Sequence, residues 1–352
     1  MMTSSASAAI EMQTRFTKLV GVRYPVMQEG LGPYKTVYLA AAVANAGGLG
    51  TISIPGITEE VGRGAALLRG YIEEACALTD GKLAVNVPVG TDKATGQVLP
   101  FSAAYVSAVV EATRDPEIAK RLCVITTSAG APGAARRLIE SSGLLHFHKV
   151  GGTKQALRAE QDGVDAIIAS GYEAGGHTHS RPVHTFILVP SVAEAVSIPV
   201  ILTGGARDGR SLAIALAMGA DAVAFGTRFV ACHDNPDWNP AYAQRILDAS
   251  EGEDVVFSAI YGPSRALPSE GLTELAALIG AGTDNDTLTR FKDARLIEAQ
   301  RDGNMRGGIL PAGQISGAIN DMIDVASFVP GVVAEAAIIL RGLSRYCTPQ
   351  DP

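Results

Sequence analysis

The chain has 352 residues, 47% of them hydrophobic and 18% charged, which is enough for one large or two medium domains with a real core. Its 29 basic and 36 acidic residues give a net charge of -7 without any basic run, so nucleic acid and anionic membranes are poor candidates for partners. No segment has the ~20 apolar residues of a membrane helix, and no signal pattern opens the chain, so we expect a soluble, cytoplasmic protein.

Short apolar runs alternate with longer helical segments along the first two thirds of the chain. Eight runs have the composition of buried strands and are centred near residues 25, 50, 84, 124, 148, 167, 200 and 223. Helices are predicted around them, over residues 11–19, 36–46, 59–78, 103–121, 133–141, 153–161, 191–196 and 209–218. Eight such units predict an α/β fold, a (β/α)8 TIM barrel, and the even spacing of the later strands favours it over a doubly wound open sheet.

The alternation fails after Thr227. Residues 235–310 contain helical pieces at 240–250 and 287–301 and an irregular stretch at 261–268. They predict an inserted, mostly helical lobe over the barrel mouth that would contact the substrate. The barrel would then comprise residues 15–230, completed by 311–345, with a last helix over 333–343.

The four cysteines lie far apart in the sequence. Cys76, Cys123, Cys232 and Cys347 form neither a Cys-x-x-Cys pair nor a zinc-like spacing with histidines. They are expected to be reduced thiols, and no metal site is predicted.

Within residues 168–179 the sequence changes from apolar to glycine-rich and polar. It begins as a buried strand and continues through Gly171, Gly175 and Gly176 to His177. Glycine permits close backbone approach to a ligand, and histidine exchanges a proton near neutral pH. His177 is therefore the candidate catalytic base, although a plain glycine-rich loop is the alternative.

Two further glycine motifs follow predicted strands seven and eight, at Gly204-Gly205 and Gly226-Thr227. In TIM barrels these loops often bind phosphate through backbone N–H groups. Neither a G-x-G-x-x-G fingerprint after strand one nor a P-loop is present, which argues against a Rossmann NAD site and most nucleotide hydrolases. FMN fits better, with its phosphate on these loops.

Together, the segments 24–28, 41–50, 171–177, 202–205 and 219–229 resemble the nitronate monooxygenases, once called 2-nitropropane dioxygenases. The resemblance covers about residues 15–345, and the superfamily also contains flavin-dependent enoyl-ACP reductases and NADH:quinone reductases. It implies FMN as cofactor and His177 as the catalytic histidine. The residues implied to bind the cofactor are Met27, Gln28, Glu29, Asn86, Lys149, Gly175, Gly176, Gly204, Gly205, Gly226, Thr227 and Gln314.

Some of these residues have a structural alternative. Asn86 could satisfy neighbouring backbone groups, and Lys149 could be a solvated strand end. His146 and His148 share one face of their strand, which would be the barrel wall, so they are weaker candidates than His177.

Two positions depart from the family pattern. Glu29 brings a carboxylate close to the expected flavin ring, where it could alter the flavin potential or the choice of substrate. The segment 178–181, Thr-His-Ser-Arg, stands where the family often has Arg-Gly, so the substrate is left open.

The resemblance implies oxidation of alkyl nitronates by O2 to a carbonyl compound and nitrite, with His177 acting as a base toward nitroalkanes or as a donor to the nitronate oxygens. One alternative is an NAD(P)H-dependent flavin reductase of an enoyl thioester or quinone. Another is a phosphate-ligand-binding barrel without turnover. The expected partners are a small-molecule substrate and O2, and a homodimer formed through the lobe or the last helix is left open.

Overall fold

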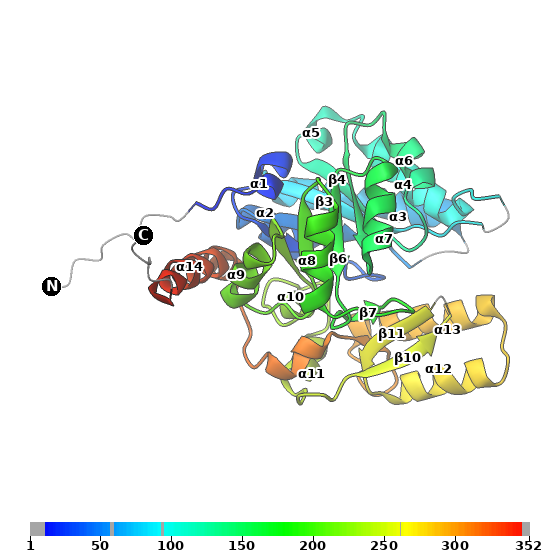
Figure 1. Cartoon of the computed structure of the whole chain (residues 1–352). Helices are drawn as coiled ribbons and strands as arrows, with labels where there is room; N and C mark the ends of the chain where they lie inside the picture. Colours follow the sequence, from blue (N-terminus) through cyan, green and yellow to red (C-terminus); the bar gives the residue numbers. More distant parts are fainter. Residues whose placement is uncertain (1–10, 57–59, 93–94, 261, 347–352) are drawn as a thin grey trace.

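The computed structural model describes residues 11–56, 60–92, 95–260 and 262–346. Eight parallel strands close into a barrel, because the first strand pairs with both the second and the last (Figure 1). In ring order the strands are β1 (Val26–Gln28), β2 (Leu49–Ser53), β3 (Lys82–Pro88), β4 (Leu122–Ser128), β5 (Leu145–Val150), β6 (Ala166–Ser170), β8 (Val200–Thr203) and β9 (Ala222–Phe225). The predicted TIM barrel and its eight strands are confirmed.

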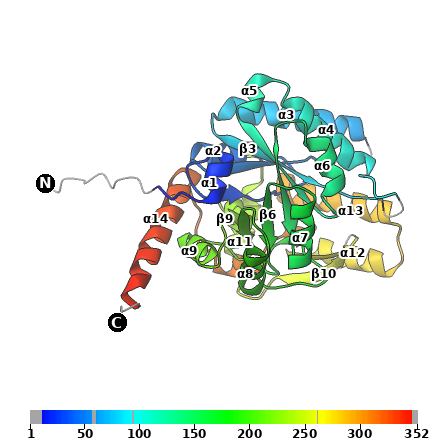
Figure 2. The ribbon, with the colours of Figure 1, turned by 45° about the horizontal axis from the view of Figure 1, so that its top comes forward.

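An outer layer of helices surrounds the barrel (Figure 2). Its members are α2 (Val37–Asn45), α3 (Val61–Leu78), α4 (Pro100–Ala112), α5 (Pro116–Ala119), α6 (Gly133–Ile139), α7 (Thr153–Gln161), α8 (Thr185–Ala195), α9 (Gly209–Ala217) and α14 (Val325–Leu343). Helix α1 (Arg15–Val20) packs against the barrel interior, and α10 (Thr227–Val230) follows β9 at the mouth. The helix predicted over 103–121 is wrong in extent, because the chain breaks before Pro116 and forms two helices.

Two other helices begin earlier than predicted, at Thr185 and Val325, and each contains an internal proline, Pro190 and Pro330. Proline lacks the N–H that an interior helix position donates, and both predicted helices therefore began only after the proline. Buried apolar residues lie on both sides of each proline, so packing against the barrel maintains the helix despite the lost hydrogen bond.

The barrel interior is filled with apolar side chains from successive strands. Met27, Phe147 and Ile168 belong to this layer, and Phe16 of α1 joins it with its ring centroid 6.2 Å from that of Phe147. Burial of these side chains stabilises the barrel by removing apolar surface from water. The interior is thus a packed core, and space for a ligand is left at the mouth, where the strands end.

A second unit follows α10 and packs beside the mouth (Figure 1). It contains the helices α11 (Pro240–Leu247), α12 (Glu270–Gly280) and α13 (Asn285–Ile297), a π-helical turn (Glu298–Asp302), a 3-10 helix (Gln314–Ala318), and the strands β10 (Val255–Ala259), β11 (Gly262–Leu267) and β12 (Leu310–Pro311). Residues 262–267 of the predicted irregular stretch instead form β11, Pro268 follows the strand, and residue 261 lies outside the described residues. The lobe therefore has a small antiparallel sheet besides its helices, and its division from the barrel stays a prediction.

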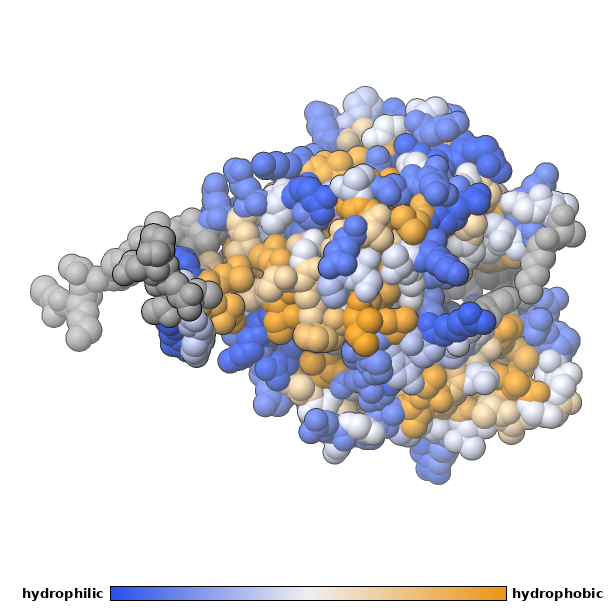
Figure 3. All heavy atoms as spheres, in the orientation of Figure 1, coloured by the Kyte–Doolittle hydropathy of each residue, from blue (hydrophilic) through white to orange (hydrophobic). Residues whose placement is uncertain are grey.

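Helix α14 is long and apolar enough to cross a membrane by length and composition, but one such helix is weak evidence for a span. Its buried face, which includes Val329 and Val333, packs into the core that also holds Leu212 of α9. Apolar surface is also visible over α8 and α9 (Figure 3), where Phe186 and Ile214 are exposed. Cys76, Cys123 and Cys232 are free thiols, as predicted, and Cys347 lies outside the described residues.

Candidate active site

The barrel brings the predicted site residues to one end. Because all eight strands are parallel, their carboxyl ends share one side of the ring. Glu29 directly follows β1, Lys149 is near the end of β5, and Thr227 begins α10 after β9. The glycine pairs after β6 and β8 lie on the same side, so residues far apart in sequence form one mouth.

An ion pair forms the centre of this mouth. Lys149 Nζ lies 2.6 Å from Glu29 Oε2, and the side chains of Glu29 and Lys149 are 7% and 24% exposed. The second carboxylate oxygen, Glu29 Oε1, is buried without a hydrogen-bond partner. Lys149 is therefore a paired, largely buried cation and not a solvated strand end.

Three other predicted residues make contacts within the barrel. Met27 is packed in the interior layer, and Gln28 exchanges hydrogen bonds with the Thr51 backbone through both its side-chain oxygen and its side-chain nitrogen. Asn86 Nδ2 donates to Thr126 Oγ1 over 2.9 Å. These contacts stabilise the walls of the mouth, and a role of the three side chains toward a cofactor stays a prediction.

The loops after β8 and β9 are built on glycines. Gly204 and Gly205 have φ angles of 97° and 78°, in the left-handed region that favours glycine. A Cβ added at Gly205 or Gly226 would be in ordinary van der Waals contact, 3.5 Å from the Glu173 side chain or 3.7 Å from the Glu29 side chain. That these loops form a cradle that binds an anion through backbone N–H groups stays a prediction.

The segment around Gln314 returns to this cradle from the lobe. The Gly313 N–H donates to Thr227 Oγ1 over 2.9 Å, and the Gln314 N–H donates to the Glu173 carbonyl over 3.0 Å. A Cβ on Gly175 would lie 2.5 Å from the backbone of Ala312, so Gly175 is required for this close approach. The return segment thus ties the loop after β6 to the loop after β9.

His177 lies on β7 (Gly176–His177), a two-residue strand that pairs with β11 of the lobe. Gly176 has a φ of 70°, and a Cβ added to it would meet no atom within 4 Å, so open space adjoins the histidine. His177 is an exposed residue, yet desolvation by the surrounding protein lowers its pKa to about 4, and the charges of Lys292 and Lys149 act in the same direction. His177 is therefore neutral at pH 7.

Sequence reasoning missed two cationic residues of the lobe. Lys292 of α13 is one of the charges that act on His177. Arg265 of β11 forms a buried ion pair with Asp254, donates to the Tyr172 carbonyl over 2.9 Å and lies 4.5 Å over the Tyr172 ring. Only the tertiary fold brings these residues to the mouth, and the irregular appearance of 261–268 hid the strand that carries Arg265.

Part of the glycine-rich motif has a structural role. The Glu173 carboxylate accepts hydrogen bonds from the Thr185 N–H and hydroxyl over 3.0 and 2.7 Å, at the first turn of α8. His146 and His148 are buried in the wall, as predicted, and their rings lie 2.7 and 2.8 Å from Thr127 Oγ1. The ring of His179 packs against Gly151, which directly follows β5, so this histidine also lies near the mouth.

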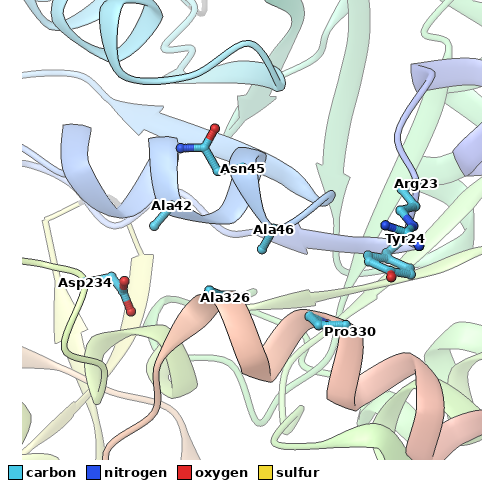
Figure 4. Close-up of a pocket in the computed structure, with 8 residues that line it drawn as sticks. All are labelled: Arg23, Tyr24, Ala42, Asn45, Ala46, Asp234, Ala326 and Pro330. Carbon is cyan, nitrogen blue, oxygen red and sulfur yellow. The ribbon is translucent and has the colours of Figure 1, made fainter. Parts of the chain in front are cut away.

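A separate cavity of about 450 Å³ lies outside the barrel, between α2 and α14 (Figure 4). Its lining residues are Arg23, Tyr24, Ala42, Asn45, Ala46, Asp234, Ala326 and Pro330. None of the predicted site residues lines it, so it is distinct from the mouth.

Known proteins resemble this chain over most of its length. The family model described as nitronate monooxygenase matches residues 13–335. The nitronate monooxygenase of Pseudomonas aeruginosa is 31% identical over 76% of this chain and 83% of its own. A second relative, from Mycobacterium tuberculosis, is named (3aS,4S,5R,7aS)-5-hydroxy-7a-methyl-1-oxo-octahydro-1H-indene-4-carboxyl-CoA dehydrogenase. It is 30% identical over 95% of this chain and 99% of its own. The structure of FabK from Thermotoga maritima superposes with a TM-score of 0.82 at 31% identity and covers 95% of this chain and 99% of its own.

Proposed function

Since the chain belongs to the nitronate monooxygenase family of flavin-dependent oxidoreductases, we propose that it binds FMN and oxidises alkyl nitronates with O2 to a carbonyl compound and nitrite. The observation that carries this proposal is the neutral His177 beside open space at the mouth, within the field of two lysines. An anionic, already deprotonated carbon acid suits such a site.

The residues at the mouth fit the cofactor. The cradle at Gly204-Gly205 and Gly226-Thr227 would hold the phosphate, and the unpartnered Glu29 Oε1 is an acceptor for a donor that the protein itself does not supply. When bound, FMN would supply the capacity to accept electrons from the substrate and pass them to O2. Lys149 and His177 would lie on the barrel side and the lobe side of the ligand space.

The lowered pKa of His177 favours nitronates over nitroalkanes as substrates. A base with a pKa of about 4 is a weaker proton acceptor than an ordinary imidazole, and proton transfer is most efficient when the pKa lies near the working pH. A nitronate needs no proton removed, and a neutral imidazole can still donate one N–H to a nitronate oxygen. Lys292 would add attraction for the negative charge, whereas the charge of Lys149 is compensated by Glu29.

Replacement of His177 by Asn separates the two roles. H177N retains an N–H donor but cannot act as a base, so we expect kcat/KM for nitroalkanes to fall by at least ~100-fold and that for nitronates by less than ~10-fold. Steady-state oxygen consumption with nitroethane and with its nitronate would measure both values. An equal loss with both substrates would disprove the base role.

A second candidate function is oxidation or reduction of a CoA thioester. It is favoured by the relative named as a carboxyl-CoA dehydrogenase, which aligns over 95% of this chain. Like nitroalkanes, thioesters are carbon acids, so His177 could serve either chemistry. Oxidation of NAD(P)H under anaerobic conditions in the presence of an enoyl-CoA would support this candidate, because a nitronate monooxygenase needs neither.

A further inference from the structure

The Glu29–Lys149 pair crosses the barrel. In the eight-stranded ring, β1 and β5 are separated by four positions in either direction, so they lie on opposite sides. Glu29 follows β1 and Lys149 belongs to β5, yet Nζ and Oε2 are only 2.6 Å apart. The two side chains therefore reach inward and meet over the packed interior, where they form a polar floor for the mouth.

One atom of this floor lacks a partner. Glu29 Oε2 is engaged by Lys149, whereas Glu29 Oε1 is buried and accepts no hydrogen bond. An unsatisfied buried acceptor costs roughly 1–3 kcal/mol, and more when it is charged. In a site that opens to a ligand, the natural donor is a group on that ligand.

The position of Glu29 indicates which part of the ligand donates. Its N–H donates to the Phe225 carbonyl over 3.0 Å, and its Cβ lies 3.7 Å from the place where a Cβ on Gly226 would be. Glu29 therefore stands between the phosphate cradle after β9 and Lys149 near the barrel axis. In FMN the group that joins phosphate to ring is the ribityl chain, which carries three hydroxyl donors.

We propose that Glu29 accepts a hydrogen bond from the ribityl chain of FMN through Oε1 and lowers the reduction potential of the flavin by neutralising Lys149. This inference rests on the proposed FMN site. Reduction adds negative charge to the flavin, which an uncompensated ammonium group would stabilise. The paired carboxylate removes that stabilisation and favours transfer of electrons onward to an acceptor.

Two substitutions separate the two parts of the proposal. E29Q removes the charge but retains an amide oxygen as acceptor, whereas E29L removes both. We expect E29Q to increase the affinity for reduced relative to oxidised FMN at least ~10-fold, which raises the midpoint potential by ~30 mV for a two-electron couple. E29L should also weaken binding of oxidised FMN by ~10-fold, measured by fluorescence titration without substrate. Circular dichroism would establish that each variant is folded.

Variants of the lysine and of a second ion pair provide the controls. K149Q should shift the potential in the opposite direction, and E29Q/K149Q should return it close to the wild-type value. E74Q is the matched control, because Glu74 of α3 forms a 2.7 Å ion pair with Lys35 away from the Glu29–Lys149 floor, and this variant should leave the potential unchanged.

The possible failures are distinguishable. If wild-type protein binds no FMN, the proposed cofactor is wrong. If wild-type and E29Q bind FMN with the same midpoint potential, the cofactor is retained and neutralisation is disproved. If E29L binds oxidised FMN as tightly as wild type does, the ribityl hydrogen bond is disproved, and a substrate group becomes the donor to Glu29 Oε1.

Discussion

Residues 148 and 149 are neighbours on β5, yet they belong to two polar clusters with opposite properties. His148 points into the wall, where it and His146 lie 2.8 and 2.7 Å from Thr127 Oγ1. Lys149 points into the barrel and pairs with Glu29. Successive strand residues face opposite sides, so one strand carries both clusters.

The clusters differ in what they leave unsatisfied. In the wall, burial lowers the pKa of His146 to about 3 and that of His148 to about 4, so both rings are neutral. One neutral nitrogen, His146 Nδ1, lacks a partner there. At the mouth the unpartnered atoms of the described residues belong to charged groups, Glu29 Oε1 and Arg265 Nε, whose desolvation is more costly. The wall cluster thus consists of neutral groups and the mouth cluster of charged ones, and a ligand that pairs with the latter stays a prediction.

Acid should destabilise the wall. His146 and His148 stay neutral in the folded chain but take up protons near pH 6.5 when unfolded, so stability is complete above pH 6.5 and falls as the pH drops toward their folded pKa values of about 3 and 4. Between pH 7 and pH 5 the two residues together should cost roughly 4 kcal/mol of unfolding free energy.

Urea unfolding of wild type and H148N at both pH values would measure this loss, because H148N should lose the roughly 2 kcal/mol that His148 contributes to the pH dependence. An unfolding free energy that is the same at pH 7 and pH 5 would contradict the assignment of two buried neutral histidines.

The hydroxyl at the centre of the wall cluster should have the next largest effect. T127V is nearly isosteric but leaves both histidine rings without their shared partner, so we expect a loss of about 3 kcal/mol in unfolding free energy. FMN affinity should stay within ~2-fold of wild type, because the ring contacts face away from the mouth. A large loss of FMN affinity in folded T127V would show that the wall and the mouth are not independent.

The smallest stability effect is expected at His177. This side chain is exposed to solvent, so H177N should change the unfolding free energy by no more than ~0.5 kcal/mol while it reduces nitroalkane turnover. Thermal unfolding of flavin-free protein would measure it. A destabilisation comparable with that of T127V would place His177 among the structural residues.

The sequence predicted those parts of the site that depend on local pattern. Buried strands followed by glycines, as at Gly204 and Gly226, are recognisable from composition and position, and so is His177 after a glycine pair. Contacts between strands on opposite sides of the barrel cannot be recognised in this way. The meeting of Glu29 with Lys149 depends on barrel closure, and the pairing of His177 with Ser264 depends on a strand that begins at Gly262-Pro263 and therefore resembles a loop.

Proline also misled the prediction of helix boundaries at Pro190 and Pro330, where packing outweighs local preference. The mouth residues Arg265 and Lys292 had no recognisable signal, because their relevance arises only when the lobe folds beside the barrel. The sequence thus identified the histidine and the glycine loops, whereas the arrangement of the charged side chains around them depends on the tertiary structure.

The most direct test of the proposed function is oxygen uptake by FMN-loaded protein when propionate 3-nitronate is added without NAD(P)H, with nitrite assayed in the same sample. Rapid uptake accompanied by nitrite is the predicted result. Flavin-replete protein that consumes no oxygen and releases no nitrite would contradict nitronate oxidation and favour the CoA thioester as substrate.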